Sequence, residues 1–119
     1  MQVINGITGV SVYEKVGNRS AIAEASIVEE KGITPKGNIK TIYYFNRIVV
    51  PCEMDSNGIG SMMLDRLLEE VKLRDGALLC DINPYGRLGY CALREWYIRH
   101  GFREYLNETN AGFSLWYNA

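Results

Sequence analysis

The first fifty residues carry patterns that are typical of β-strands. From residue 21 every second residue is apolar as far as Ile27, which is the period of a half-buried strand. A loop is expected across residues 31–38, where glycine, proline and asparagine cluster. The segment before Pro51 is almost continuously apolar or aromatic, as expected of a central strand covered on both faces. The pattern predicts three strands, at residues 10–16, 21–29 and 42–50.

The period of the apolar residues changes after Gly58. Apolar residues from Ile59 to Val71 recur mostly four positions apart, with charged residues mostly elsewhere, and this spacing indicates an amphipathic helix. A second helix is expected to end at Gly101, which is well placed as a C-cap. The later elements are predicted as a helix from residue 59 to about 75, a strand at 77–82, a helix at 88–100 and strands at 103–106 and 113–117.

This order of elements predicts an α/β (α+β) fold with a mixed, mostly antiparallel sheet and two main helices. The strands that flank the first helix are expected to form a central parallel pair, since a helical crossover joins them. The chain of 119 residues is too short for two independent hydrophobic cores. We therefore expect residues 1–119 to form a single domain.

Composition narrows the range of partners. Thirteen basic and fourteen acidic residues give a net charge of −1, so a general nucleic-acid-binding surface is not expected. The three cysteines (Cys52, Cys80, Cys91) and the single His100 do not have the spacing of a disulfide framework or of a metal site. No apolar run approaches the ~20 residues of a membrane helix, and no signal peptide is evident. The expectation is a cytoplasmic protein without metal or membrane partners, in which Cys80 is a small core residue.

The loop before the first helix is the most informative segment. It contains Gly58-x-Gly60 between a buried strand and a helix, and unpaired N–H groups at a helix start favour a pyrophosphate. The dinucleotide-binding pattern GxGxxG fails because Met63 occupies its third glycine position. The P-loop pattern fails too, since no Gly-Lys-Ser/Thr follows. The alternative is that both glycines only form a tight turn.

A second motif follows in the next helix, where Tyr97 precedes Gly101 by four residues and Phe102 comes next. Together the two motifs resemble those of the GNAT superfamily of N-acetyltransferases. The family's Q/R-x-x-G-x-G/A segment corresponds to residues 55–60, and its Tyr-x-x-x-Gly-Phe segment corresponds to the second motif. The resemblance covers about residues 41–106.

The resemblance implies acetyl-CoA as co-substrate and an unidentified amine, small molecule or protein, as acceptor. It implies that Tyr97 donates to the departing CoA sulfur, and that the amine attacks the thioester directly. A backbone N–H near Val50 would hold the oxyanion. The strand backbone would bind the pantetheine arm and the loop amides would bind the pyrophosphate, which implies the cofactor-binding residues Ile48, Val49, Val50, Asn57, Gly58, Ile59, Gly60 and Ser61.

Three features depart from the family pattern. Asp55 replaces the usual Gln or Arg, and Tyr90 replaces an asparagine seven residues before Tyr97. The segment before Ile42 lacks a helical period, whereas the family places two helices there. The acceptor side is therefore expected to be open, or to be completed by a second subunit in a homodimer or by the partner itself.

The general base stays open at this stage. Four acidic residues are candidates, and a water relay is an equal alternative: Glu24, Glu29, Glu53 and Asp81. The single His100 has no partner at a catalytic spacing and is expected to compensate a helix dipole. The departures also favour an alternative function, in which a GNAT fold has lost catalysis and acts as a binding or inhibitor protein.

Overall fold

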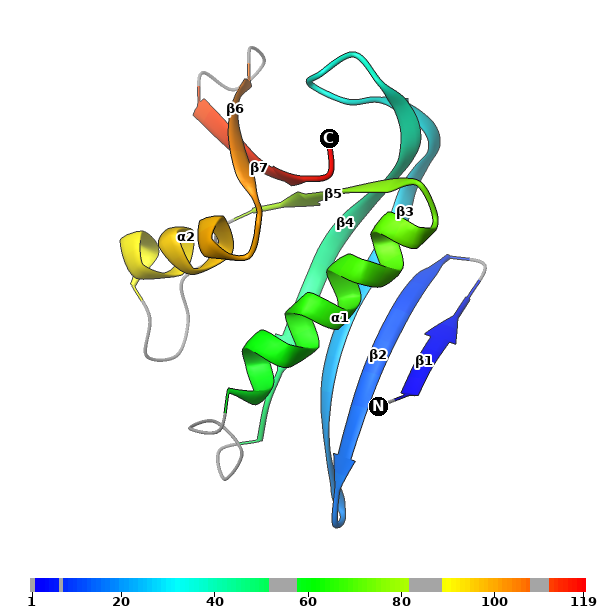
Figure 1. The fold of residues 1–119 in the computed structure, drawn as a ribbon, viewed down its shortest axis with the longest axis vertical. Coiled ribbons are helices and arrows are strands. Elements are labelled where there is room, and N and C mark those ends of the chain that lie inside the picture. The colour runs from blue at the N-terminus through cyan, green and yellow to red at the C-terminus, as the bar shows by residue number, and fades with distance from the viewer. Residues whose placement is uncertain (1, 7, 52–57, 82–88, 108–111) are drawn as a thin grey trace.

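The computed structural model describes residues 2–6, 8–51, 58–81, 89–107 and 112–119. Within them, seven strands form one sheet and two helices pack against it (Figure 1). Its elements are β1 Gln2–Asn5, β2 Gly9–Val16, β3 Arg19–Ile33, β4 Ile39–Val49, α1 Ile59–Leu73, β5 Gly76–Cys80, α2 Tyr90–Arg99, β6 Arg103–Asn107 and β7 Gly112–Tyr117. The sheet order is β1-β2-β3-β4-β5-β7-β6, with β4 and β5 parallel and the other neighbours antiparallel. The mixed, mostly antiparallel sheet is therefore confirmed.

The structure has four strands before the first helix, where the sequence pattern predicts three. The additional strand, β1, pairs with β2 at the edge of the sheet, with Val3 opposite Val12. Its Gln2 and Asn5 are polar and exposed, so β1 produces no alternating apolar signal. Strand β3 is also longer than predicted and continues to Ile33, which leaves a shorter loop at residues 34–38 than the one predicted.

Helix α1 buries one face against β2, β3, β4 and β5. Five of its apolar residues are at most 3% exposed: Met63, Leu64, Leu67, Leu68 and Val71. These positions follow the spacing that predicts the helix. The strands on either side of α1 in the chain, β4 and β5, pair in parallel, which confirms the predicted crossover.

Strand β4 is covered on one face only along its second half. Phe45 is buried beneath the helices, whereas Asn46 and Arg47 are exposed. The prediction of a strand covered on both faces is wrong here, because both helices pack on the same face of the sheet. The other face carries polar pairs that suit exposure: Arg47 Nε donates to Glu24 and Asn46 Nδ2 donates to Ser26, each at 2.5 Å.

Both helices end close to the predicted residues. Gly101 follows α2 with φ of 103°, and the Phe102 N–H donates to Tyr97 O at 3.2 Å, which closes the last turn. After α1 the left-handed residue is Asp75, with φ of 51°, and not Gly76, which is the first residue of β5. The connection between α1 and β5 is short, and β5 lies directly beside β4.

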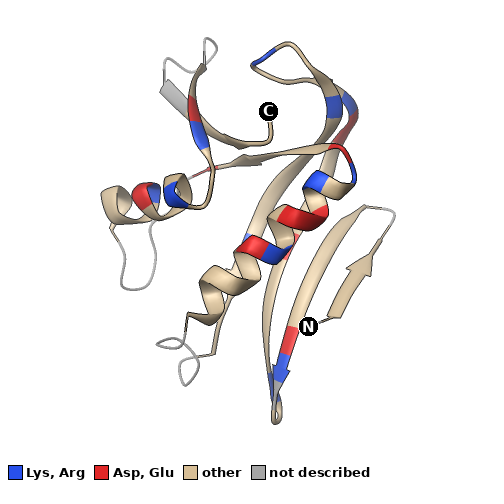
Figure 2. Ribbon diagram, in the orientation of Figure 1, with Lys and Arg blue, Asp and Glu red and all other residues tan. Residues whose placement is uncertain are grey.

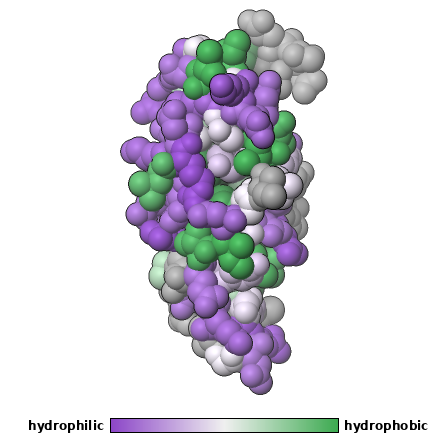
Figure 3. Space-filling model, turned by 90° about the vertical axis from the view of Figure 1, so that its right-hand side faces the viewer, coloured by the Kyte–Doolittle hydropathy of each residue, from purple (hydrophilic) through white to green (hydrophobic). Residues whose placement is uncertain are grey.

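The surface on the side of β1, β2 and β3 is mainly hydrophilic, with separate hydrophobic patches (Figure 3). Val28, Ile33 and Ile39 are among the exposed apolar residues of the β3–β4 hairpin. Within the described ranges, no helix is both long enough and apolar enough to span a bilayer.

Candidate functional site

Strands β4 and β5 separate partway along the sheet. Their parallel pairing ends at Tyr44 opposite Leu79, and β4 continues to Val49. Residues 45–49 pair with β3 on one side, and no described strand pairs with their other side. Backbone N–H and C=O groups on that side are available to an extended ligand. We call this opening, between residues 45–49 and Cys80 at the end of β5, the fork.

The first turn of α1 lies beside the end of β4. A Cβ atom placed on Gly60 would be 3.7 Å from Cγ2 of Val50, the residue after β4. The N-cap Gly58 provides no side-chain cap, and its carbonyl accepts from the Met62 N–H at 3.1 Å. The N–H groups of residues 59–61 therefore have no carbonyl partner within the helix. Because the first turn contains no acidic residue, these N–H groups and the helix dipole together favour an anion.

The two glycines of this turn have different structural explanations. Gly58 has φ of 70°, in the left-handed region, so the turn itself requires glycine. A side chain at Gly60 would meet only an ordinary contact distance, so packing does not require glycine there. Glycine costs up to ~1 kcal/mol relative to alanine in a helix. The tight-turn explanation thus holds for Gly58, while Gly60 leaves room against the backbone for a ligand.

Tyr97 reaches into the fork from α2. Its side chain is buried, and its ring packs edge-on against Phe45 of β4 with the ring centroids 5.9 Å apart. Its hydroxyl hydrogen-bonds the thiol of Cys80 at the end of β5. Tyr97 therefore contacts both strands at the point where they have separated.

The Cys80 thiol is buried, as the sequence predicts, and it is protonated at neutral pH. Burial is the main cause that raises the pKa of Cys80 to about 12; the Tyr97 hydrogen bond opposes it and the Asp81 charge adds to it. The thiol lies 3.4 Å from the backbone oxygen of Asp81, to which it donates. The Tyr97 hydroxyl is consequently directed at a neutral sulfur atom.

Tyr44 and Asp81 meet at the base of the fork. The Tyr44 hydroxyl donates to Asp81 Oδ2 at 2.6 Å. This hydrogen bond is the largest cause that raises the pKa of Tyr44 to about 12, followed by burial and by the negative charge of Asp81. Asp81 is exposed and directly follows Cys80, so its carboxylate lies in solvent at the edge of the fork.

The structure brings most of the predicted binding residues together at the fork. Ile48 and Val49 lie on β4 beyond its last pair with β5, and Val50 follows them. The predicted residues Gly58, Ile59, Gly60 and Ser61 form the N-cap and the first turn of the adjacent α1. Asn57 lies outside the described residues.

The four candidate bases are not equally placed. Asp81 lies at the fork, whereas the Glu24 carboxylate is held in an ion pair with Arg47. Glu29 lies opposite Ile42, on the part of β4 that is paired with β5. Glu53 lies outside the described residues. Geometry thus favours Asp81 among the three candidates that are described.

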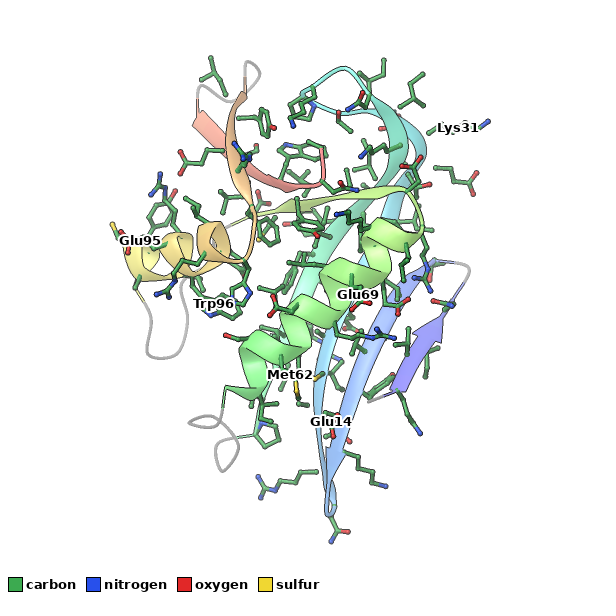
Figure 4. All side chains as sticks on the ribbon, viewed as in Figure 1. Glu14, Lys31, Met62, Glu69, Glu95 and Trp96 are labelled. Atoms are coloured by element: carbon green, nitrogen blue, oxygen red, sulfur yellow. The ribbon has the colours of Figure 1, made fainter. Side chains whose placement is uncertain are left out.

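Two hydrogen bonds between the helices are not indicated by the sequence pattern. Trp96 extends from α2 toward α1, and its Nε1 donates to Ser61 Oγ at 3.1 Å (Figure 4). His100 Nδ1 lies 2.6 Å from Asp65 Oδ1, so His100 has a partner on the other helix in addition to its place at the end of α2. Both pairs join residues that are 35 positions apart, and no local spacing signals such contacts. Together they hold α2, and with it Tyr97, beside the first half of α1.

No protein-family model and no curated protein matches the sequence. Solved structures do match. A GNAT-family protein from Desulfovibrio desulfuricans has a TM-score of 0.63 at 18% identity, over 92% of this chain and 68% of that chain. The ribosomal-protein-S18-alanine N-acetyltransferase of Escherichia coli has a TM-score of 0.62 at 16% identity, over 94% and 68% of the two chains. An aminoglycoside 6′-N-acetyltransferase in complex with coenzyme A has a TM-score of 0.59 at 14% identity, over 92% and 71%. The chain has the fold of these GNAT acetyltransferases.

Proposed function

We propose that this protein is an acetyl-CoA-dependent N-acetyltransferase that acts on an amine by direct attack on the thioester. The observation that carries the proposal is the fork, where β4 leaves β5 beside the uncapped first turn of α1 and Tyr97 stands between the strands. A structural neighbour with the same fold was solved with coenzyme A. The three features together suit a ligand with an extended arm, a diphosphate and a sulfur atom.

The pantetheine arm would lie along the open side of β4. Its amide groups would pair with backbone groups of Ile48, Val49 and Val50, in the way that an added strand pairs with a sheet edge. The diphosphate would then reach the N–H groups of residues 57–61. Gly60 supports this placement, because no described residue fills the space beside its Cα.

Tyr97 would act on the leaving group. When the amine nitrogen attacks the acetyl carbon, a C–N bond forms, the C–S bond breaks, and CoA leaves as the thiol after it gains a proton. The Tyr97 hydroxyl is already directed at a sulfur atom, that of Cys80. A small change in its direction would let it donate to the CoA sulfur instead. A backbone N–H near Val50 would hold the oxyanion.

Asp81 would receive the proton that the acceptor ammonium must lose, directly or through water. Amines of the lysine type have a pKa near 10.4, so they must be deprotonated before they attack. Asp81 is exposed beside Cys80, and its hydrogen bond with Tyr44 at 2.6 Å would hold the carboxylate near the reacting atoms. No other described candidate base lies at the fork.

The acceptor would approach from the sheet face that the helices leave open. Two of the structural neighbours are an acetyltransferase for alanine of ribosomal protein S18 and one for aminoglycosides. Because their acceptors differ so much, the acceptor screen should contain peptides, aminoglycosides and simple amines. Light scattering on the same preparation would test whether a second subunit completes the acceptor side.

Calorimetric titration with acetyl-CoA tests the binding half of the proposal. Wild type should bind in the micromolar range. Gly60→Glu should weaken binding at least tenfold, because it places bulk and negative charge where the diphosphate would lie. Gly6→Glu, the same change at the turn between β1 and β2, is the matched control and should bind as wild type does. Equal affinities for wild type and Gly60→Glu would show that the first turn of α1 does not bind acetyl-CoA.

Thiol release during the acceptor screen tests the catalytic half. A productive acceptor should release CoA in proportion to acetylated amine. If acetyl-CoA binds and Gly60→Glu abolishes that binding, but no amine is acetylated, the chain instead fits the alternative of a GNAT-fold binding protein.

A further inference from the structure

A cleft lined by basic residues lies near the C-terminal end of α1. With a rise of 1.5 Å per residue, it is about 20 Å from the first turn of the helix. The cleft has a volume of about 300 Å³ and opens between the β3–β4 turn, the last turn of α1, and strands β6 and β7. Figure 2 shows basic segments on all of these elements except β7. We call it the basic cleft, after the four cationic residues that line it: Lys36, Lys40, Lys72 and Arg103.

The charge of the basic cleft is not balanced by acidic side chains. No Asp or Glu is among the described residues that line it. Within the described part of the chain, Lys36, Lys72 and Arg103 form no ion pair. Four arginines on other surfaces, by contrast, are paired with glutamates: Arg47, Arg66, Arg74 and Arg94. Since the whole chain carries a net charge of −1, the four cations that line the cleft form a local excess of positive charge.

Hydrogen bonds hold one wall of the cleft in place. Thr34 Oγ1 and Asn38 Nδ2 donate to the oxygen of Ala119, at 2.8 and 3.0 Å. Lys40 Nζ donates to the oxygen of Asn118 at 2.8 Å. The Lys40 ammonium group is therefore held in place, and two of its three N–H donors are still available. The β3–β4 turn and the chain after β7 consequently form a connected surface.

The opposite wall carries aromatic side chains. Arg103 of β6 lies directly opposite Trp116 of β7, so their side chains share one face of the sheet. Tyr105, two residues after Arg103, faces the same way and also lines the cleft. A planar ring can stack on such side chains, while phosphate oxygens bind the ammonium and guanidinium groups.

We propose that the basic cleft binds a small phosphate ester with a planar ring, of the size of a mononucleotide. The volume is at the lower limit of those that hold small ligands. Phosphate would neutralise the charge of Lys36, Lys72 and Arg103, and the ring would lie against Trp116. The site is separate from the fork, and the proposed acetyl transfer does not require it.

Tryptophan fluorescence can test the ligand class, since the chain has two tryptophans, of which Trp116 lines the cleft. The probes are AMP, adenosine, which lacks the phosphate, and inorganic phosphate, which lacks the ring. AMP should bind saturably and at least tenfold more tightly than either fragment. Its quenching should persist in Trp96→Phe and disappear in Trp116→Phe. No saturable binding of AMP, or equal binding of inorganic phosphate, would overturn the proposal.

Charge variants locate the binding and separate it from the coenzyme site. Lys72→Gln and Arg103→Gln should each weaken AMP binding at least fivefold, whereas Lys15→Gln, on the distant strand β2, should not change it. Gly60→Glu should also leave AMP binding unchanged, because it alters only the start of α1. Loss of AMP binding in Gly60→Glu would instead assign AMP to the fork, and unchanged binding in both cleft variants would contradict the proposal. Calorimetry gives the same affinities without relying on fluorescence, and thermal melting verifies that each variant is folded.

Discussion

The β4–α1–β5 unit has a paired end, where residues 41–44 pair with residues 76–79, and an open end at the fork. The two ends differ in what fills the space around their glycines. At the paired end, protein atoms fill it: a Cβ atom on Gly76 would lie 2.5 Å from Cε1 of Tyr43 and 3.1 Å from the Val71 oxygen. At the fork, a Cβ atom on Gly60 would meet, among the described residues, only the Val50 side chain, at 3.7 Å. Packing therefore requires glycine at the paired end, whereas no contact with the described residues requires glycine at position 60.

This difference explains how one sheet can be stable and also offer a site for a ligand. Backbone groups at the paired end are satisfied by the β4–β5 ladder. Along residues 45–49 no described strand pairs with the side away from β3, and the N–H groups in the first turn of α1 have no partner within the helix. Substitutions at the paired end should therefore change stability, and substitutions at the fork should change binding or turnover.

The largest effect is expected at the fork from Tyr97→Phe. A thiol with a pKa near 8.5 is already a fair leaving group, so loss of the phenol should lower kcat about 100-fold, the low end of the range for acid catalysis. The affinity for acetyl-CoA should stay within about twofold of wild type. Steady-state kinetics with the acceptor found in the screen measure both, and Tyr13→Phe on β2 is the matched control. An unchanged kcat would show that the Tyr97 hydroxyl does not take part in the reaction.

Gly76→Ala and Gly60→Ala compare the two ends directly. Gly76→Ala should destabilise the fold by about 2 kcal/mol, because its methyl group overlaps the Tyr43 ring and the Val71 carbonyl. Gly60→Ala should leave the free energy of unfolding within about 1 kcal/mol of wild type, since it gains helix propensity and meets no clash. Urea denaturation measures both. Similar losses in the two variants would contradict the distinction between packed and open ends.

Asp81→Asn should lower the pKa of Tyr44 from about 12 toward its usual value near 10, because it removes the acceptor charge of the hydrogen bond. In wild type the raised pKa favours the folded state below pH 10, and this contribution is lost as the pH rises from 10 toward 12. The variant should therefore lose less stability than wild type across that range. The difference in phenolate absorbance between the two proteins reports the shift, and it should vanish when both carry Tyr44→Phe. A difference that persists in that background would assign the shift to another tyrosine.

The smallest effect is expected from Asp65→Asn, which weakens the contact between α1 and His100 of α2. Asp65 is exposed, so solvent screens the pair, and the loss should be about 0.5 kcal/mol. Chemical denaturation at pH 6 measures it, with Glu95→Gln on the exposed side of α2 as a control. A loss above about 2 kcal/mol would mean that the helix contact is a main support of the fork.

Most of the fold could be predicted from periodic patterns. The four-residue spacing of apolar side chains defines α1, and the buried strands on either side of it lead to the parallel pair. Strand β1 could not be predicted, because it has only four residues at the edge of the sheet, and its two apolar residues, Val3 and Ile4, are adjacent and leave no alternating pattern. The exposure of the second half of β4 could not be predicted either. Its apolar residues suggest that both faces of the strand are covered, but no described helix packs on one of these faces.

Only part of the candidate site could be predicted from the sequence. Motifs identify Gly58, Gly60 and Tyr97, since each depends on local spacing. The contact of Tyr97 with Cys80, and that of Tyr44 with Asp81, depend on which strands are neighbours and where they separate. Such contacts join distant parts of the chain and require the register of the sheet, which no single segment contains.

Nuclear magnetic resonance of the backbone amides during acetyl-CoA titration tests the account most directly. Saturating acetyl-CoA should shift the amide signals of residues 48–50 and 59–61 more than those of the paired end, at residues 41–44 and 76–79. The same titration of Gly60→Glu should leave these signals in place. If acetyl-CoA shifts no amide at the fork of the wild-type protein, the fork is not a coenzyme site.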